Sequence, residues 1–175
     1  MTQAAPFRGR RMVGVAFAVD FIAVGFFFYS FSVFYPAMDA DFEGASFWVA
    51  AGISVSTLGG GLLGPIIGRW LDRVSLRRIM LLGAVITSAG FVLLSQTREI
   101  WQYYLVLGTF FAFGLRMMGG MASGKLVANW FAANRGAALG IATVGVSLSG
   151  LVMPTIATWL VEEIGWRRGF LVYAV

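Results

Sequence analysis

Residues 68–80 read GRWLDRVSLRRIM, and this polar stretch separates two long apolar runs. It holds five charged side chains: Arg69, Asp72, Arg73, Arg77 and Arg78. The runs on either side, residues 45–67 and 79–97, carry no charge. Each is close to the roughly 20 apolar residues that a helix needs to cross the hydrocarbon core of a bilayer. The stretch therefore predicts a short turn between two membrane-spanning helices.

The composition extends this interpretation to the whole chain, because 59% of the 175 residues are hydrophobic and only 12% are charged. We expect an all-helical, multi-pass membrane domain at residues 12–175, preceded by a cytoplasmic tail at residues 1–11. The predicted spans are residues 12–38, 45–67, 79–97, 100–124 and 136–161. The first is longer than a typical signal-peptide core, which favours a retained helix over a cleaved signal. A sixth apolar run begins at Gly169 and is too short to span, so we expect the chain to be truncated within a sixth helix.

Several kinds of chemistry are excluded by residues that the sequence lacks. It contains no Cys and no His, which excludes disulfides and thiol nucleophiles and removes the usual zinc ligands. We therefore expect neither a zinc enzyme nor a thiol enzyme, and we predict no metal site, no cofactor and no enzymatic activity. Residues 119–126, GGMASGKL, fit part of a phosphate-binding loop, but Leu126 replaces the required Ser or Thr and no strand precedes the loop. Nucleotide binding is rejected on these grounds.

The net charge of +5 is spread over short loops between spans, so it indicates membrane topology and not nucleic-acid binding. With a cytoplasmic N-terminus, outside loops hold only Arg98, Arg167 and Arg168, beside acids such as Glu43 and Glu99. The other loop cations fall inside: Arg8, Arg10, Arg11, Arg69, Arg73, Arg77, Arg78, Lys125 and Arg135. This distribution satisfies the positive-inside rule and predicts a multi-pass protein of the cell membrane with its N-terminus in the cytoplasm.

Glycines precede the polar turn at regular spacing. Gly60, Gly64 and Gly68 recur every four residues, so they share one face of the second predicted span. Small residues at this spacing let a neighbouring helix backbone approach closely. We expect this face to pack against another helix.

The turn itself resembles the loop signature of the major facilitator superfamily of secondary transporters, through Gly68, Asp72, Arg73, Arg77 and Arg78. The resemblance implies that the chain is the N-terminal six-helix half of a twelve-helix protein, and that its partner is the missing C-terminal half. It also implies that the turn is a conformational latch, which holds the two halves together on the cytoplasmic side and releases them as access alternates.

A second stretch is similar to one branch of that superfamily. Residues 130–150, WFAANRGAALGIATVGVSLSG, carry an aromatic pair, a basic residue and then small residues that include Gly140, Gly145 and Gly150. This order, and GWRRGF at residues 165–170, resembles the monocarboxylate transporter and oxalate/formate antiporter branch. The resemblance implies a small organic anion as substrate, with a proton or a counter-anion as a further partner. Symport, antiport and uniport stay open, as do a transporter for drugs or other neutral or cationic solutes and a non-transporting scaffold or receptor.

Two charges interrupt the predicted spans, Asp20 in the first and Arg116 in the fourth. A charge within the membrane is costly and usually faces a cavity or a partner. A rise of about 1.5 Å per residue places both at one depth, roughly 12 to 13 Å from the cytoplasmic edge. The resembled fold makes their spans neighbours, so we expect the two side chains to meet, either as an ion pair or with a substrate carboxylate competing for Arg116. A guanidinium suits that role because its planar fork binds a carboxylate through two hydrogen bonds.

Helical spacing adds further candidates for this site. On the Arg116 face these are Thr109, Ala112, Phe113 and Ser123, and on the Asp20 face Phe27 and Phe31. Three alternatives stay open: a purely structural ion pair, an Arg116 side chain that reaches the cytoplasmic interface, and an Asp20 that carries a coupling proton.

Overall fold

The computed structural model describes residues 9–42, 46–131 and 134–175, and every regular element within these ranges is helical. Most of the predicted tail, including Arg8, lies outside the described residues. So do Glu43 and residue 45, where the second span was predicted to begin.

The described residues form five long helical segments. The first joins α1 (Gly9–Val24), the π-helical turn η1 (Gly25–Tyr29) and α2 (Ser30–Asp41). The second and third are α3 (Ser46–Arg73) and α4 (Leu76–Ser95). The fourth joins α5 (Ile100–Val106), the π-helical turn η2 (Leu107–Phe111), α6 (Ala112–Met118) and α7 (Gly120–Trp130), and the fifth is α8 (Arg135–Tyr173). All five are long and apolar enough to cross a membrane, which confirms the all-helical, multi-pass fold.

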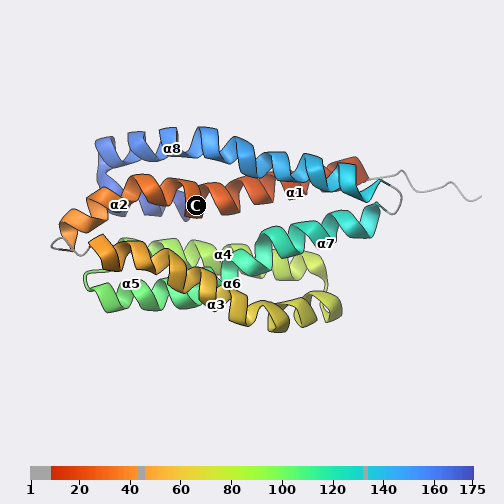
Figure 1. Cartoon of the computed structure of the whole chain (residues 1–175), viewed down its shortest axis with the longest axis horizontal. Helices are drawn as coiled ribbons and strands as arrows, with labels where there is room; N and C mark the ends of the chain where they lie inside the picture. Colours follow the sequence, from red (N-terminus) through yellow and green to blue (C-terminus); the bar gives the residue numbers. More distant parts are fainter. Residues whose placement is uncertain (1–8, 43–45, 132–133) are drawn as a thin grey trace, which may run out of the picture.

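The helices extend beyond the apolar runs from which they were predicted. The first segment covers Gly9–Asp41 and the fourth Ile100–Trp130, because backbone hydrogen bonding continues through polar residues at the ends of both. A larger difference occurs inside α8, where Gly165 has φ 79° and ψ 161°. Helical structure resumes at the next residue, Trp166, before the predicted start at Gly169. The chain folds back here, and its C-terminus points toward the middle of the bundle (Figure 1).

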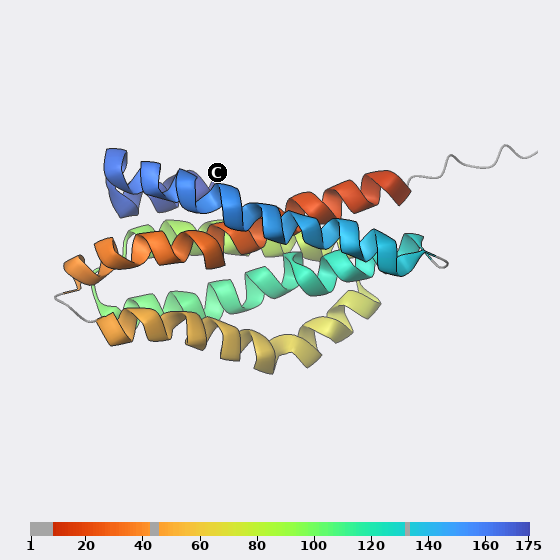
Figure 2. The same ribbon diagram turned by 45° about the horizontal axis from the view of Figure 1, so that its top comes forward.

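The connections between helices lie at two opposite ends of the bundle (Figure 1). One end holds the start of α1, the α3–α4 turn, the end of α7 and the start of α8, and we call it the Asp72 end. The other holds the end of α2, the start of α3, the α4–α5 connection and the reversal at Gly165, and we call it the Asp41 end. Between them, α1 packs chiefly on α8 and α7, whereas α3 and α4 pack on α6. The second half of α3 bends (Figure 2), and a proline inside this helix, Pro65, accounts for a bend there.

The hydrophobic core differs between the two ends. A large cluster rich in aromatic residues, including Phe34, Phe91 and Phe170, joins α2, α4 and the last turns of α8. Toward the Asp72 end the core divides into a cluster around Ala16 on α1 and a separate cluster around Ile67 on α3. Helix α7 contributes to both smaller clusters, so it is the element between the two groups of helices.

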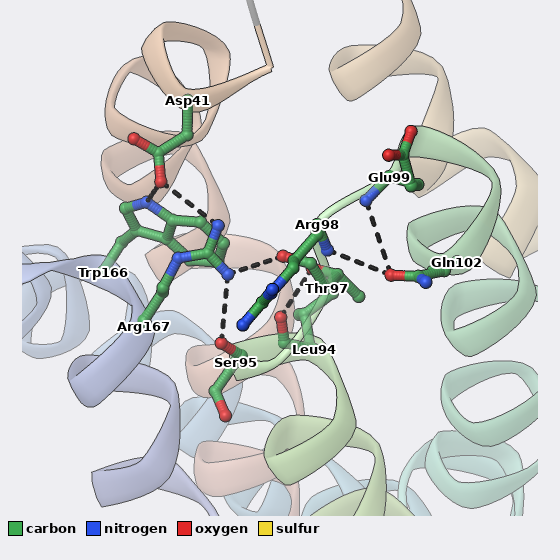
Figure 3. Close-up of polar contacts among 9 residues, drawn as sticks. All are labelled: Asp41, Leu94, Ser95, Thr97, Arg98, Glu99, Gln102, Trp166 and Arg167. Carbon is green, nitrogen blue, oxygen red and sulfur yellow. Dashed lines mark hydrogen bonds and ion pairs between the residues drawn. The ribbon is translucent and has the colours of Figure 1, made fainter.

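The Asp41 end is closed by polar contacts that we call the Arg167 cluster (Figure 3). Arg167 donates to the backbone carbonyls of Thr97 and Ser95, at 2.5 and 3.3 Å, and pairs with Asp41 at 3.3 Å. The Trp166 indole donates to the same Asp41 oxygen at 2.9 Å, and the Arg167 guanidinium carbon lies 4.2 Å from the centre of the indole ring. Cationic groups at a helix C-terminus satisfy its free carbonyls, so the cluster fixes the end of α4 to α2 and to the last part of α8.

Of the predicted packing glycines, three lie at close contacts. A Cβ atom on Gly145 would collide with the backbone carbonyl of Phe17, and one on Gly150 would lie 3.0 Å from the Tyr29 ring. At Gly60 the neighbour is the Arg116 side chain, 2.6 Å from the added atom. Gly64 and Gly140 have no atom within 4 Å of such a Cβ in the described structure. The packed face of α3 therefore includes Gly60 but not the residue one turn later.

Candidate functional site

The first and fourth helical segments both depart from α-helical geometry near their centres. Each contains a π-helical turn, η1 and η2, and Phe27 of η1 stacks on Phe111 of η2 with ring centres 4.9 Å apart. Ser30 donates to the carbonyl of Gly25 at 2.9 Å, which satisfies an acceptor within the first π turn. Such turns are frequent at functional sites because they re-aim side chains within a helix. The contact between the two turns therefore indicates where a functional site is expected in this fold.

A cavity of about 210 Å³ lies beside this contact. Its walls come from the first, second and fourth helical segments, and most of its lining side chains are apolar or small. The lining residues are Ala23, Val24, Phe28, Ser56, Thr57, Phe111, Leu115, Arg116, Gly119, Gly120 and Met121. Arg116 is the only charged residue among them.

Arg116 is a cation without a protein partner in the part of the chain that the structure describes. It makes no hydrogen bond or ion pair with any described residue, although it lies in the middle of a membrane-spanning segment. Its side chain crosses α3 at Gly60, where any larger residue would meet the guanidinium stem. An unpaired charge inside a membrane protein is costly unless it faces water or a ligand, so the cavity beside Arg116 is a candidate anion site.

Asp20 has a different surrounding. Its carboxylate is 5% exposed and accepts hydrogen bonds from the Ser123 hydroxyl, at 2.8 and 2.9 Å from the two oxygens. No ion pair joins Asp20 to Arg116 among the described residues. The direct pairing that we expected from their equal depth is therefore not formed in this structure, and Asp20 links α1 to α7 through a serine.

A break in the fourth helical segment explains why Ser123 contacts Asp20. Gly119 has φ −86° and ψ −158°, an extended conformation that separates α6 from α7. The prediction placed Ser123 on the Arg116 face because it assumed a continuous helix over seven residues. The break changes the direction of α7, so Ser123 points toward α1 instead.

The other predicted wall residues do not line the cavity. Ala112 is buried against Gly59, Phe113 packs in the cluster around Ile67, and Thr109 donates to the carbonyl of Leu105 at 2.6 Å. Phe27 and Phe31 are buried in the aromatic core. Besides Arg116, Gly120 and Met121, the fourth segment lines the cavity with Phe111, Leu115 and Gly119, which are spaced four residues apart. They occupy the neighbouring stripe of the helix, and Arg116 reaches the cavity from beside that stripe because its side chain is long.

The predicted latch has an acidic and a basic part. Asp72 forms an ion pair with Lys125 on α7, and the same Lys125 ammonium donates to the Leu71 carbonyl at 2.6 Å. Gly68 lies 3.7 Å from the end of the Met121 side chain, measured from an added Cβ. The basic residues Arg73, Arg77 and Arg78 are exposed and bond to no other described side chain. Lys125 was predicted only as an inside-loop cation, and its contact with Asp72 was not predicted from the sequence.

Helix α7 therefore contacts both Asp20 of α1 and Asp72 of α3. Ser123 binds the buried carboxylate of Asp20, and Lys125, two residues later, binds the exposed carboxylate of Asp72. Since α7 begins at the break beside the cavity, one short helix connects the cavity, the buried acid and the turn at the Asp72 end.

Comparison with known proteins places this arrangement in a family. Residues 17–175 match the sequence profile of the Major Facilitator Superfamily. Monocarboxylate transporter 3 of Mus musculus is 30% identical over 93% of this chain and 32% of its own length. Monocarboxylate transporter 6 of Homo sapiens is 29% identical over 81% of this chain and 28% of its own length. The Fujikurins efflux protein of Gibberella fujikuroi is 31% identical over 59% of this chain and 22% of its own length. The chain thus spans about a third or less of each of these relatives.

Proposed function

Because this chain belongs to the Major Facilitator Superfamily, we propose that it forms the N-terminal six-helix part of a secondary transporter for small organic anions of the monocarboxylate type. Family membership makes it a transporter-family membrane protein and not an enzyme. In the proposal, the rest of the transporter covers the cavity, and the two parts expose it alternately to each side of the membrane. The N-terminus and the Asp72 end face the cytoplasm.

The observation that carries this proposal is Arg116, the one charge on the cavity wall, with no partner among the described residues. A guanidinium in a site of low polarity binds a carboxylate strongly, because its fork matches the two oxygens. Relatives named as monocarboxylate transporters support the same class of substrate. A single cation is balanced by a substrate with a single negative charge.

Asp20 and the basic turn have supporting roles in the proposal. Asp20 is the candidate for a coupling proton, since it is a buried acid held between α1 and α7 by Ser123. Arg73, Arg77 and Arg78 are exposed at the Asp72 end, where they are available to the other half of the transporter, whereas Asp72 is engaged by Lys125. The basic residues therefore make the latch contact between halves, and the acid fixes the turn to α7.

A second candidate is efflux of neutral or cationic organic compounds. It is favoured by the similarity to a protein named for efflux and by the apolar remainder of the cavity wall. The charge of Arg116 on the same wall favours the small anion over a neutral or cationic compound.

The test uses the full-length gene product reconstituted in liposomes. Uptake is measured for radiolabelled short-chain monocarboxylates, a dicarboxylate, a neutral amide of the same size and an organic cation. We expect saturable uptake of the monocarboxylates, and a loss of about 100-fold in kcat/KM for Arg116→Gln, because the variant removes the charge that binds the carboxylate.

Arg98→Gln is the matched control, since Arg98 is exposed at the Asp41 end and only its backbone N–H is bonded, to Gln102 at 3.0 Å. This variant should transport like the parent protein. Uptake of the neutral or cationic compound with none of the acids would establish the efflux alternative. Full carboxylate uptake by Arg116→Gln would remove Arg116 from the site.

A further inference from the structure

Ser56 differs from the other buried serines and threonines of the described chain. The others each donate a hydrogen bond to a protein acceptor: Ser30, Thr87, Ser95, Thr97, Ser123 and Ser149. Ser56 is 4% exposed, and its hydroxyl has no hydrogen-bond partner among the described residues. The Ser56 oxygen is not among the fully buried atoms without a partner in the described structure, so it stays accessible to water or a ligand in the cavity that Ser56 lines.

The position of Ser56 indicates which ligand. It lines the cavity that contains Arg116, and Gly60, one turn later on the same face of α3, is where the Arg116 side chain crosses. The face of α3 that carries Ser56 thus presents a free hydroxyl, and one turn further it leaves room for a guanidinium. Ser56 and Arg116 are therefore two hydrogen-bond donors that line the same cavity and have no acceptor among the described residues.

The rest of the wall is suited to a short apolar group. Val24 and Phe28 come from the first helical segment and Leu115 from the fourth, and none of them offers a charge. Thr57, the neighbour of Ser56, uses its hydroxyl for the carbonyl of Ile53 at 2.8 Å. Ser56 is therefore the free neutral donor of this wall, and Arg116 is its charged donor.

We propose that Ser56 is a specificity-determining residue of the anion site. Its hydroxyl donates to the substrate carboxylate that Arg116 binds through its fork, and the alkyl part of the substrate lies against Val24, Phe28 and Leu115. This inference rests on the proposed transport of monocarboxylates and adds the second binding group. Ser56 distinguishes a carboxylate from an ester or amide of the same size, because only a carboxylate keeps a strongly accepting lone pair for the hydroxyl after both of its oxygens have bonded to the Arg116 fork.

The test compares Ser56→Ala with Ser56→Thr and Ser54→Ala in the full-length protein in liposomes. Ser54 is the matched control because it lies on the same helix and is exposed. The measured quantities are KM and kcat for a short monocarboxylate and the inhibition constants of the corresponding acid, amide and methyl ester. For Ser56→Ala we expect KM for the acid to rise about tenfold, since a hydrogen bond to a charged group is lost.

The kcat of Ser56→Ala should stay within about twofold of the parent value, which is the pattern for lost binding alone. Its inhibition by the amide should be unchanged. Ser56→Thr keeps the hydroxyl and should restore KM, which a role in helix packing alone does not predict.

Each other outcome overturns the inference. If the parent protein transports the acid and Ser56→Ala has the KM of Ser54→Ala, the second binding group is excluded while the proposed function stands. The same holds if Ser56→Thr is as impaired as Ser56→Ala, because the hydroxyl is then not the cause. If the parent protein transports none of the acids, the proposed function and this inference fall together.

Discussion

The two charges inside the membrane domain, Asp20 and Arg116, belong to the same bundle and have opposite surroundings. Asp20 is buried, and its carboxylate accepts a hydrogen bond from Ser123 at 2.8 Å, so it has a partner within this chain. Arg116 lines a cavity and has no partner among the described residues. A charged group that is hydrogen-bonded within the fold stabilises the structure, whereas a charged group without a protein partner is available to bind a ligand. The difference separates two roles that the sequence alone left open, between an ion pair of these residues and a site in which a substrate carboxylate competes for Arg116.

Ser123→Ala tests the structural side of this comparison and should have the largest effect on stability. The variant leaves the buried Asp20 carboxylate without its donor, so we expect a loss of about 1 to 2 kcal/mol in the free energy of unfolding. The measurement is denaturant-induced unfolding in detergent micelles. Ser147→Ala, at an exposed position of α8, is the control. An unchanged stability would mean that the Asp20–Ser123 bond is not a fixed link between α1 and α7.

Asp20→Asn sharpens the comparison because it separates the hydrogen bond from the charge. The amide oxygen still accepts from Ser123, so stability should change by less than about 1 kcal/mol. If Asp20 carries the coupling proton, uptake by this variant should lose its dependence on an imposed pH gradient while exchange of internal for external substrate continues. Uptake that still follows the gradient would show that coupling resides elsewhere.

The smallest effect is expected at the other acid held by α7. The Asp72–Lys125 pair is partly exposed, with side-chain exposures of 74% and 29%, so its coupling energy should be about 0.5 kcal/mol. A double-mutant cycle of Asp72→Asn and Lys125→Gln measures this quantity by unfolding. A coupling above about 2 kcal/mol would place Asp72 with Asp20, as a charge on which the fold depends.

The long helices, and the two charged residues that lie within apolar runs, could be predicted from the sequence. Asp20 and Arg116 stood out because each interrupts an apolar run, and that signal does not depend on helix geometry. Their partners could not be predicted in the same way. Helical spacing predicted that Ser123 lies on the same face as Arg116. The extended conformation of one residue, Gly119, turns α7 so that Ser123 contacts Asp20 instead.

Ser56 and Lys125 were missed for a related reason. A serine in a membrane helix is common, and its importance appears only when its hydroxyl is found without a partner beside the cavity. Lys125 follows a span, where a basic residue already has an explanation in the positive-inside rule. Its proximity to Asp72 depends on how α7 lies against α3, which no local pattern describes.

The Arg167 cluster has a consequence for the order in which this domain matures during synthesis. The carbonyls of Ser95 and Thr97 become part of the chain about 70 residues before the arginine that binds them, and Asp41 precedes Arg167 by 126 positions. At a translation rate of roughly 5 to 20 residues per second, the end of α4 stays open to water or the insertion machinery for several seconds. The first three helical segments therefore enter the membrane before the contacts of Arg167 with α2 and with the end of α4 can form. These contacts form only after the chain has reversed at Gly165.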